Sequence, residues 1–479
     1  MAELEAVIGL EIHVQLSTKT KMFCGCSPSF GDEPNVHTCP VCLAHPGVLP
    51  VPNEEAIGYA LKIAAALECE VAPRSIFHRK NYFYPDNPKA YQISQYDVPI
   101  AGAGRLGGVR IHRAHLEEDA AKMIHLGGSG RIHGSGASMV DFNRGGTPLV
   151  EIVTEPDLRS AAEAAAWARL LRTTVRQLDV SDVNMEEGSL RVDANVSVRP
   201  AGSEALGTKT ELKNMNSFRF LERGIEAELA RQRELIGAGG TVVQETLHFH
   251  PEDGSLTPLR SKEEAHDYRY FPEPDLVPLA PTEAMLREAR ESLPELPEAR
   301  MLRYREEMGL PEDVSAQLAA DPETADYFER VAQAGIGVEF RVVANWVTGE
   351  LTAAQRQEDP NVGVSDSKAT PEALAALVAM VHEKKISHGS GKTVLATLVA
   401  EGGDPAAIVE REGLAQISDS GELESIVAAA VDSNPEAAEQ VRAGNGKAIG
   451  AIVGAVMKET KGRADGGEVN HLIREQLGL

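Results

Sequence analysis

Three segments of the chain, within or directly after strand-like runs, carry acidic residues, and two of them also carry a histidine. In residues 7–16, VIGLEIHVQL, Glu11 and His13 fall between alternating apolar residues, so both would leave the same face of a strand. Glu151 stands in the apolar run PLVEIVT, where an unpaired carboxylate would be costly, and Glu117 lies in the acidic run HLEED. Carboxylates and a histidine from separate strands would suit Mg²⁺ at a phosphoryl-transfer site. Spacing alone leaves open the alternative that these are ordinary surface acids.

Four of the five cysteines form two close pairs. Cys24 and Cys26 make the first pair, and Cys39 and Cys42 make the second, a spacing that can bring four thiolates around one tetrahedral Zn²⁺. With four protein ligands such a zinc would be structural, and the alternative is four reduced thiols without a metal. The fifth cysteine, Cys69, is expected to pack as a small apolar side chain.

Two glycine-rich segments match nucleotide-binding motifs only in their letters. GAGRLG at 102–107 has the spacing of a dinucleotide fingerprint, but the residues after it resemble a strand, which predicts a hairpin loop. GSGKT at 389–393 resembles the end of a Walker A loop, but Ile386 occupies the position of the first glycine and a helix is expected before it. We expect neither segment to bind phosphate.

The charge of the chain restricts how it could contact nucleic acid. Lysine and arginine number 47 against 72 aspartates and glutamates, a net charge of −25, which excludes binding through bulk positive charge. Residues 72–113, however, hold seven cations against two acids, with six aromatic residues, as is typical of a surface for an RNA end or a nucleotide. Residues 442–463 hold five cations against one acid. Either region could instead be a solvated face.

Length and composition indicate the class of protein. A chain of 479 residues, 42% apolar and 25% charged, predicts about three globular domains. It has neither a run of about 18 apolar residues nor a signal-peptide pattern at its N-terminus, which predicts a soluble, cytoplasmic protein without a membrane partner. Four clustered cysteines suit metal binding in a reducing compartment better than disulfides.

The elements that would position these residues change in character twice along the chain. Up to about residue 290, strand-like runs alternate with turns and a few helices, which indicates an α+β fold. One helix is expected after Ser160, which has the spacing of a capping box with Glu163. The Pro-rich stretch 271–297 is interpreted as a linker to helical sequence, and a break at 402–405 precedes a last helical segment.

Several long motifs make the chain similar to a known family. They are VIGLEIHVQL (7–16), RKNYFYPD (79–86), YQISQYD (91–97), HLEED (115–119), EIVTEPD (151–157), DYRYFPEPD (267–275), GKAIGAIVGAVM (446–457), KG (461–462) and VN (469–470). With these motifs the chain resembles, over essentially its whole length, the B subunits of the glutamine-dependent aspartyl/glutamyl-tRNA amidotransferases. Val192 and Asn87 depart from the family's pattern, but neither is a proposed ligand.

The resemblance implies three domains. Residues 1–294 would form an α+β cradle with a mixed or antiparallel sheet, similar to glutamine synthetase, that takes ATP, Mg²⁺ and the aminoacyl end of tRNA. Residues 295–404 would form an all-α helical domain. Residues 405–479 would form a small α-helical, YqeY-like tail domain that binds tRNA.

The resemblance also implies site residues. The metal-site motifs of the family match at four positions, which would hold Mg²⁺ and act in catalysis: Glu11, His13, Glu117 and Glu151. Asp193 and Asn195 are weaker candidates for a second contact with ATP and its metal. The cysteine pairs match the zinc-bearing branch of the family.

The implied reaction is the ATP-dependent transamidation of mischarged Asp-tRNA(Asn), Glu-tRNA(Gln) or both. ATP would convert the side-chain carboxylate to an acyl phosphate, from which ammonia displaces phosphate. Position 2 is alanine and no Ser-Ser-Lys amidase constellation is found, so a partner must make the ammonia. The family supplies an amidase (A) subunit and a small C subunit, in a heterotrimer. Two other classes stay open, namely a zinc-bearing RNA-binding adaptor without chemistry and an ATP-dependent ligase that acts on a free amino acid.

Overall fold

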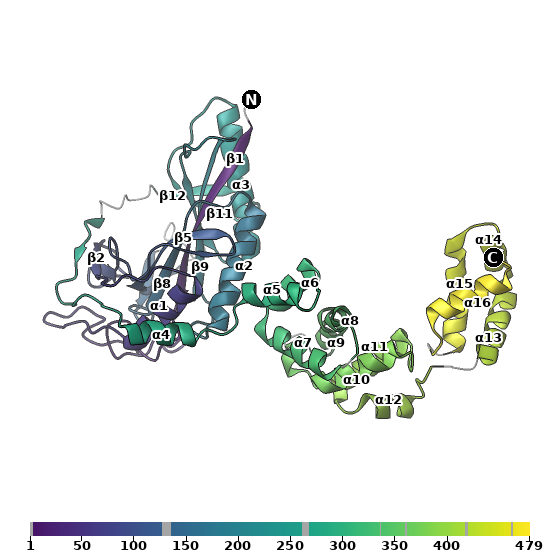
Figure 1. Ribbon diagram of the computed structural model, residues 1–479. Helices are drawn as coiled ribbons and strands as arrows, with labels where there is room; N and C mark the ends of the chain where they lie inside the picture. Colours follow the sequence, from purple (N-terminus) through teal and green to yellow (C-terminus); the bar gives the residue numbers. More distant parts are fainter. Residues whose placement is uncertain are drawn as a thin grey trace. The chain divides into compact units, whose positions relative to one another are not determined.

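A computed structural model describes residues 3–126, 136–260, 268–335, 337–359, 362–416, 420–460 and 463–479. It divides into two compact units, Met1–Pro297 and Glu298–Leu479 (Figure 1). The first unit contains all the strands of the described chain, together with four helices, and the second is helical. The predicted order of an α+β region followed by an all-helical region is therefore confirmed.

The first unit is built on an eight-stranded sheet with the order β12-β11-β10-β9-β1-β8-β5-β4. Its strands are β1 (Leu4–Gln15), β4 (Gly104–Leu106), β5 (Val109–Glu118), β8 (Pro148–Thr154), β9 (Leu190–Pro200), β10 (Thr210–Met215), β11 (Thr246–Phe249) and β12 (Leu256–Arg260). Neighbouring strands are antiparallel except β10 and β11, which are parallel, so the sheet is mixed as predicted.

Two smaller sheets accompany the large one. The first has the order β13-β2-β3, and the second pairs β6 with β7. Their strands are β2 (His78–Asn81), β3 (Tyr91–Ser94), β6 (Lys122–Leu126), β7 (Ala137–Asp141) and β13 (Phe271–Pro272).

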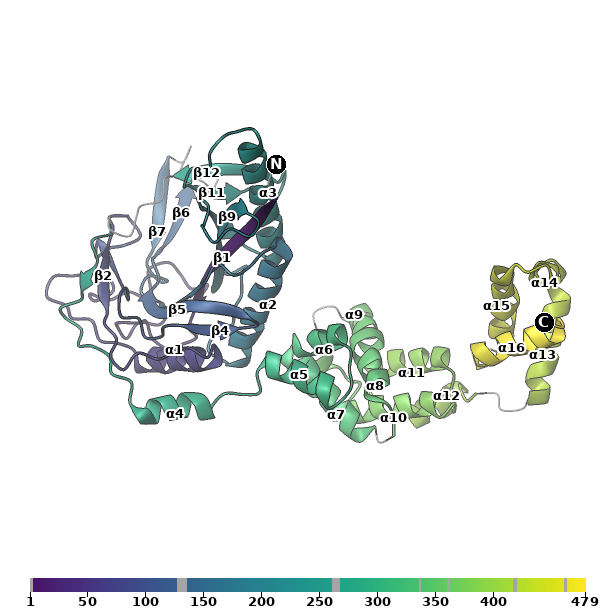
Figure 2. The ribbon, with the colours of Figure 1, turned by 45° about the horizontal axis from the view of Figure 1, so that its top comes forward.

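The apolar face of the large sheet forms the core of this unit. Alternating residues of β1, among them Ile8, Leu10 and Ile12, are at most 1% exposed and join one hydrophobic cluster with residues of α1 (Glu54–Ala66), α2 (Ala161–Gln177) and α3 (Phe218–Gly237). In both views α2 and α3 run along the same side of the sheet (Figures 1 and 2). The opposite face of the sheet is thereby left to polar side chains, because neighbouring residues in a strand point to opposite sides.

Local predictions hold at three places in the chain. Ser160 caps α2 and accepts a hydrogen bond from the Glu163 amide at 3.1 Å. The GAGRLG segment forms the β4–β5 hairpin, which turns at Gly107 and Gly108 with φ of +55° and +81°, a conformation that favours glycine. GSGKT lies in α11 (His388–Glu401), as a helical segment and not as a strand-to-helix loop.

The interpretation of residues 271–297 as a linker is wrong for part of that stretch. A helix, α4 (Glu283–Glu291), forms there and contacts α1. Ala289 is buried, and Met285 and Leu286 pack against the core of the first unit. The apolar spacing of this short helix was hidden among flanking prolines, which suggested a break in the fold.

The second unit is a succession of short helices with two hydrophobic cores among its described residues. The first core belongs to α5 (Pro297–Glu306), α6 (Glu312–Ala319), α7 (Pro322–Ala334), α8 (Phe340–Asn345), the π-helix η2 (Trp346–Leu351), α9 (Thr352–Glu358), the 3₁₀ turn η3 (Val364–Asp366), α10 (Pro371–His382), α11 and α12 (Pro405–Glu412). The second belongs to α13 (Ser420–Ser433), α14 (Pro435–Arg442), the 3₁₀ turn η4 (Gly446–Ala448), α15 (Ile449–Glu459) and α16 (Gly466–Gln476). The domain boundaries at 294 and 404 stay predictions. Among the described residues, no helix is long and apolar enough to cross a membrane.

Candidate active site and cysteine cluster

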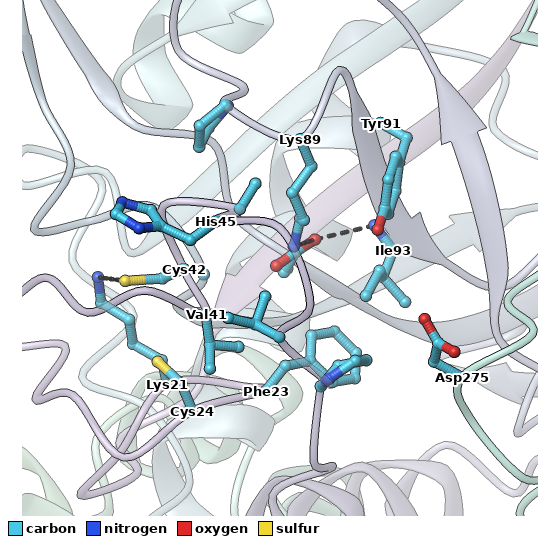
Figure 3. Close-up of a pocket in the computed structure, with 16 residues that line it drawn as sticks. Lys21, Phe23, Cys24, Val41, Cys42, His45, Lys89, Tyr91, Ile93 and Asp275 are labelled. Carbon is cyan, nitrogen blue, oxygen red and sulfur yellow. Dashed lines mark hydrogen bonds and ion pairs between the residues drawn. The ribbon is translucent and has the colours of Figure 1, made fainter.

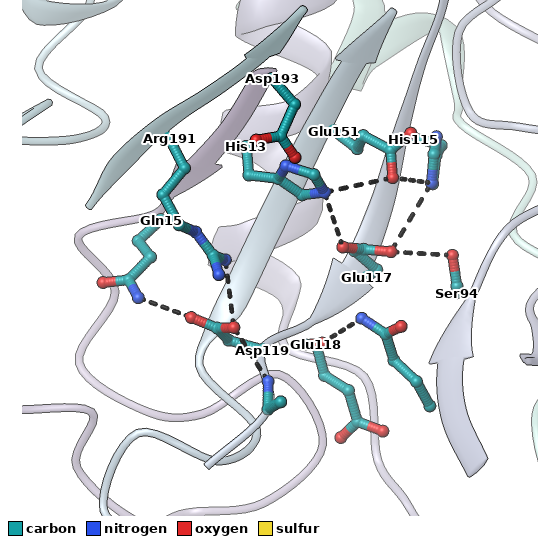
Figure 4. Close-up of polar contacts among 12 residues, drawn as sticks. His13, Gln15, Ser94, His115, Glu117, Glu118, Asp119, Glu151, Arg191 and Asp193 are labelled. Carbon is teal, nitrogen blue, oxygen red and sulfur yellow. Dashed lines mark hydrogen bonds and ion pairs between the residues drawn. The ribbon is translucent and has the colours of Figure 1, made fainter. Parts of the chain in front are cut away.

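Acidic and histidine side chains from four adjacent strands meet on the polar face of the large sheet (Figure 4). The strand register explains why. His13 of β1 lies opposite Glu151 of β8, and Glu151 lies opposite His115 of β5. On the other side of β1, Glu11 lies opposite Asp193 of β9. The predicted common face of Glu11 and His13 is therefore confirmed, and the pairing of distant strands brings the other acids to it.

Two buried carboxylates share two histidines at the centre of this face. His13 Nε2 is 3.6 Å from Glu117 Oε1 and 3.4 Å from Glu151 Oε2. His115 Nε2 is 3.8 Å from Glu117 Oε2 and 3.4 Å from Glu151 Oε2. Glu117 and Glu151 are 3% and 6% exposed, so the burial expected for Glu151 is confirmed. Ser94 donates a further hydrogen bond to Glu117 at 3.1 Å.

The possible metal ligands fall into two overlapping groups. His13, Glu117 and Glu151 have ligand atoms within 4.8 Å of one another, and so do Glu11, His13 and Asp193. The four residues predicted for one magnesium site thus lie together, but Glu11 groups with Asp193 and only His13 belongs to both groups. These donors fit Mg²⁺ because most of them are carboxylate oxygens. The assignment of any of them as a metal ligand stays a prediction.

Burial and mutual charge set the ionisation of the site. Burial raises the pKa of Glu11, and the charge of Glu151 adds to this effect. Burial by itself would lower the pKa of His13. The hydrogen bond and charge of Glu151, together with the charge of Glu117, outweigh burial and raise this pKa to about 9. Burial by itself would raise the pKa of Glu117 and of Glu151, but the two histidines outweigh it, so both pKa values are lowered. At neutral pH Glu117 and Glu151 are therefore ionised beside a protonated His13, and a metal that bound His13 would displace its proton.

Some residues of this face were not among the predicted site residues. His115 is 2% exposed, and within the described chain its Nδ1 is buried without a hydrogen bond. Lys213 of β10 places its Nζ 3.0 Å from Asp193 Oδ2. Arg113 places a guanidinium nitrogen 4.0 Å from Glu151 Oε1. Alternation could have found Arg113 and His115, because they precede Glu117 in β5 at two-residue steps.

Asn195 lies next to these groups without belonging to them. It faces Glu211 of β10, two residues along β9 from Asp193. Its Oδ1 is buried, and no described residue donates a hydrogen bond to it. A contact of Asn195 with ATP stays a prediction.

Aromatic side chains and a lysine lie close to the acids. Tyr96 and Tyr270 stack with centroids 4.3 Å apart and an interplanar angle of 7°. Lys80 Nζ lies 4.9 Å from the Tyr268 ring centroid. Burial by itself would lower the pKa of Lys80. The nearby Tyr270, Glu117 and Glu151 outweigh burial and raise this pKa above its usual range. Part of the cation-rich and aromatic segment 72–113 thus lies near the acids, as binding of a nucleotide or RNA end would require.

Not every aromatic residue of that segment is available to a ligand. Phe77 is 2% exposed and belongs to the hydrophobic core, whereas Phe83 is 93% exposed.

Three residues of the family motifs, Asp267, Lys461 and Gly462, lie outside the described residues.

The four cysteines of the predicted zinc site also come together. The sulfur atoms of Cys24, Cys26, Cys39 and Cys42 all lie within 4.8 Å of one another. Lys21, which is 1% exposed, places its Nζ 3.8 Å from Cys42 Sγ. A hydrogen bond from Cys24 lowers the pKa of Cys42 to about 4, and the charge of Lys21 contributes. This cluster could hold one zinc ion, whose four positions would all be filled by protein.

A cavity of about 210 Å³ borders the cysteine cluster (Figure 3). Cys24 and Cys42 line it on one side, and Lys89, Tyr91 and Glu118 line it on another. Lys89 and Glu118 form an ion pair there, and Glu118 also accepts a hydrogen bond from the Ile93 amide at 2.9 Å. Glu118 of this lining directly follows Glu117 of the acid cluster in β5.

Comparisons with known proteins show the family to which the chain belongs. Residues 6–287 match the family model described as the GatB/GatE catalytic domain, and residues 326–477 match that described as the GatB domain. The chain is 49% identical over 485 residues to the aspartyl/glutamyl-tRNA(Asn/Gln) amidotransferase B subunit of Brevibacillus brevis, with 100% of this chain and 99% of the relative covered. It is likewise 49% identical to the corresponding B subunits of Geotalea daltonii and Geobacter sulfurreducens, with 99% of each chain covered. The chain therefore belongs to the family of aspartyl/glutamyl-tRNA(Asn/Gln) amidotransferase B subunits.

Proposed function

We propose that this chain activates the side-chain carboxylate of aspartate or glutamate attached to tRNA, so that ammonia can convert it to an amide. The observation that carries the proposal is the cluster of His13, Glu117 and Glu151, with Glu11 and Asp193 beside it, on one face of a rigid sheet. Membership in the family of amidotransferase B subunits supports the reaction class.

Two group transfers would take place. An oxygen of the substrate carboxylate attacks the γ-phosphorus of ATP, and the bond from that phosphorus to the β-phosphate oxygen breaks, which releases ADP. Ammonia then attacks the acyl carbon, phosphate leaves with the electron pair of the broken bond, and one ammonia proton passes to the phosphate. Oxide is too poor a leaving group for direct amidation, which is why ATP is needed.

The residues of the cluster would act by holding charge and position. Glu11, His13, Glu117, Glu151 and Asp193 would hold Mg²⁺, which when bound offsets the negative charge of phosphate oxygens. Pairing in the sheet fixes their spacing before any substrate arrives, so no rearrangement is needed at the moment of transfer. Asn195 would contact ATP at the edge of the same site.

Zinc at the cysteine cluster would have a structural role. Residues 16–53 lie between β1 and α1 without a helix or strand, and the cluster would fix this long loop. The loop in turn lines the cavity next to Glu118.

The remaining parts of the reaction would come from partners and from the tail. The relatives are named as B subunits, which supports assembly with other subunits, and we propose an amidase A subunit that makes ammonia and a small C subunit. The tail would bind mischarged tRNA. Its helix α15 exposes Gly450 and Gly454, where an added Cβ would meet no atom within 4 Å, between the exposed Lys447 and Lys458. This smooth surface with flanking cations suits an RNA backbone.

The test is a transamidation assay with the reconstituted complex of A, B and C subunits. Asp-tRNA(Asn) and Glu-tRNA(Gln) are each supplied with ATP, and the amide donor is either glutamine or ammonium chloride. We expect amidated tRNA and ADP in equal amounts with either donor. A product that does not depend on ATP would point to an adaptor without chemistry, and an amidated free amino acid would point to a ligase that does not use tRNA. Either result would refute the proposal.

A further inference from the structure

Among the cations that strands of the large sheet place on the site face, Arg113 has no hydrogen-bonded acid within the described chain. Arg113 of β5 lies opposite Val153 of β8, and Val153 lies opposite Glu11 of β1. Arg113 therefore lies two residues before His115 in β5, on the same face of the sheet and at the margin of the cluster. The acid beside it is Glu151, at 4.0 Å between a guanidinium nitrogen and Oε1, which exceeds a hydrogen-bond distance.

The hydrogen-bonding capacity of Arg113 is left for a ligand. Its Nε is buried, and no group of the described chain accepts a hydrogen bond from it. An N–H group buried without an acceptor is destabilising, so an acceptor is expected when the site is filled. The side chain keeps 29% of its surface exposed, so a ligand can reach the rest of the guanidinium.

Other cations of the same face are already bound. Arg191 donates a hydrogen bond to Asp119 at 3.1 Å, and Lys213 donates one to Asp193 at 3.0 Å. Both cations therefore already bind an acid of the protein, although the Nε of Arg191, like that of Arg113, is buried without a hydrogen-bond acceptor in the described chain. Arg113 differs from them because the ionised Glu151 is near enough to orient it but does not use its N–H groups.

We propose that Arg113 is a catalytic residue that binds the phosphoryl group during its transfer from ATP to the substrate carboxylate. This inference rests on the proposed function. As the bond to the β-phosphate oxygen breaks and the bond to the carboxylate oxygen forms, negative charge stays spread over three equatorial phosphoryl oxygens. A planar guanidinium can donate two parallel hydrogen bonds to two such oxygens, which an ammonium group cannot do. The carboxylates of the cluster would repel this charge, and Arg113 supplies a compensating cation from the protein itself.

The experiment uses the reconstituted complex with Arg113→Gln and Arg113→Lys. The control is Arg105→Gln, because Arg105 lies on the neighbouring strand β4, where it forms an exposed ion pair with Glu68. The first measurement is the affinity for Mg-ADP with and without aluminium fluoride, which mimics the phosphoryl group in transfer. The second is the kcat of amidation and the KM for mischarged tRNA, with ammonium chloride as the amide donor. Circular dichroism melting shows whether each variant is folded.

We expect Arg113→Gln to bind ADP alone nearly as well as the wild type. Its affinity for ADP with aluminium fluoride and its kcat should both fall about a hundredfold or more, with a smaller loss for Arg113→Lys. Unchanged affinity for the aluminium fluoride complex in a folded variant would overturn the inference. A raised KM for tRNA with unchanged aluminium fluoride binding would also overturn it and would assign Arg113 to an RNA phosphate. If the wild-type complex itself made no ATP-dependent amide, the proposed function would fail first, and the two failures would thus be distinguished.

Discussion

Loss of one cysteine from the cluster should remove zinc and destabilise the first unit. In Cys39→Ser a hydroxyl replaces one of four thiols that lie within 4.8 Å of one another, and a hydroxyl is a far weaker zinc ligand than a thiolate. Structural zinc sites in small peptides contribute about 10–16 kcal/mol of apparent binding free energy at neutral pH. Here the loop belongs to a unit with its own large core, so we expect a fraction of this, about 3 kcal/mol, to be lost from the free energy of unfolding. At about 2 °C per kcal/mol for a unit of this size, Tm should fall by about 6 °C.

Zinc binding should also release protons. Burial and a hydrogen bond with Cys39 raise the pKa of Cys26 to about 11, and a hydrogen bond with Cys42 raises that of Cys24 well above its usual value. Both are therefore thiols at neutral pH and must lose a proton to bind zinc, whereas Cys42 is already a thiolate. With protons released from at least these two thiols, zinc affinity should fall about a hundredfold or more for each unit by which the pH is lowered.

Elemental analysis of the full-length protein, thermal melting and competition with a chelator at pH 7 and pH 8 measure these effects. Cys69→Ser is the matched control, because Cys69 lies outside the cluster and should leave one zinc per chain. If the metal-free protein melted at the same temperature as the zinc-bound protein, the structural role assigned to zinc would be refuted. A Cys39→Ser variant that keeps one zinc per chain would refute the assignment of its ligand.

Three further outcomes are expected elsewhere. Gly454→Glu on the exposed side of α15 should weaken tRNA binding about tenfold at low salt without lowering Tm, and filter binding at two salt concentrations measures it. Glu228→Ala should cost about 1–3 kcal/mol in denaturant unfolding, because it removes the buried carboxylate to which Thr210 and Gln232 each donate a hydrogen bond at 2.7 Å. Gly391→Ala should cost about 1–3 kcal/mol in the same assay, because the new Cβ would lie 2.8 Å from Val381 Cγ2. Unchanged tRNA affinity or unchanged unfolding curves would contradict the respective prediction.

Local patterns in the sequence predicted local geometry well. Alternation in residues 7–16 placed Glu11 and His13 on one face, and the apolar run around Glu151 predicted its burial, both of which hold. Capping at Ser160 and the turn at GAGRLG follow from backbone hydrogen bonding and glycine conformation, which depend on few neighbours.

Pairing between distant strands could not be derived in the same way. Which strands lie beside β1 depends on the packing of the whole core, and β8 and β9 are far from β1 in the sequence. Without this order, Asp193 could not be grouped with Glu11, and Arg113 and His115 could not be placed beside Glu151. The helix α4 was missed for a related reason, since its stability depends on contact with α1 and not on its own short sequence.

Glu151→Gln shows whether the acid cluster performs the activation step. The substitution keeps the size of the side chain and removes its charge from the point where His13 and His115 meet, each at 3.4 Å. Glu155→Gln is the control, because Glu155 follows the same strand but pairs with the exposed His112.

The measurement is the release of ADP and the formation of amidated tRNA by the reconstituted complex, with ammonium chloride in place of glutamine so that the partner's glutaminase is bypassed. We predict that Glu151→Gln lowers the rate about a hundredfold or more, with tRNA affinity and glutamine hydrolysis unchanged and Glu155→Gln active. A folded Glu151→Gln complex that turned over ATP and mischarged tRNA at close to the wild-type rate would contradict the account.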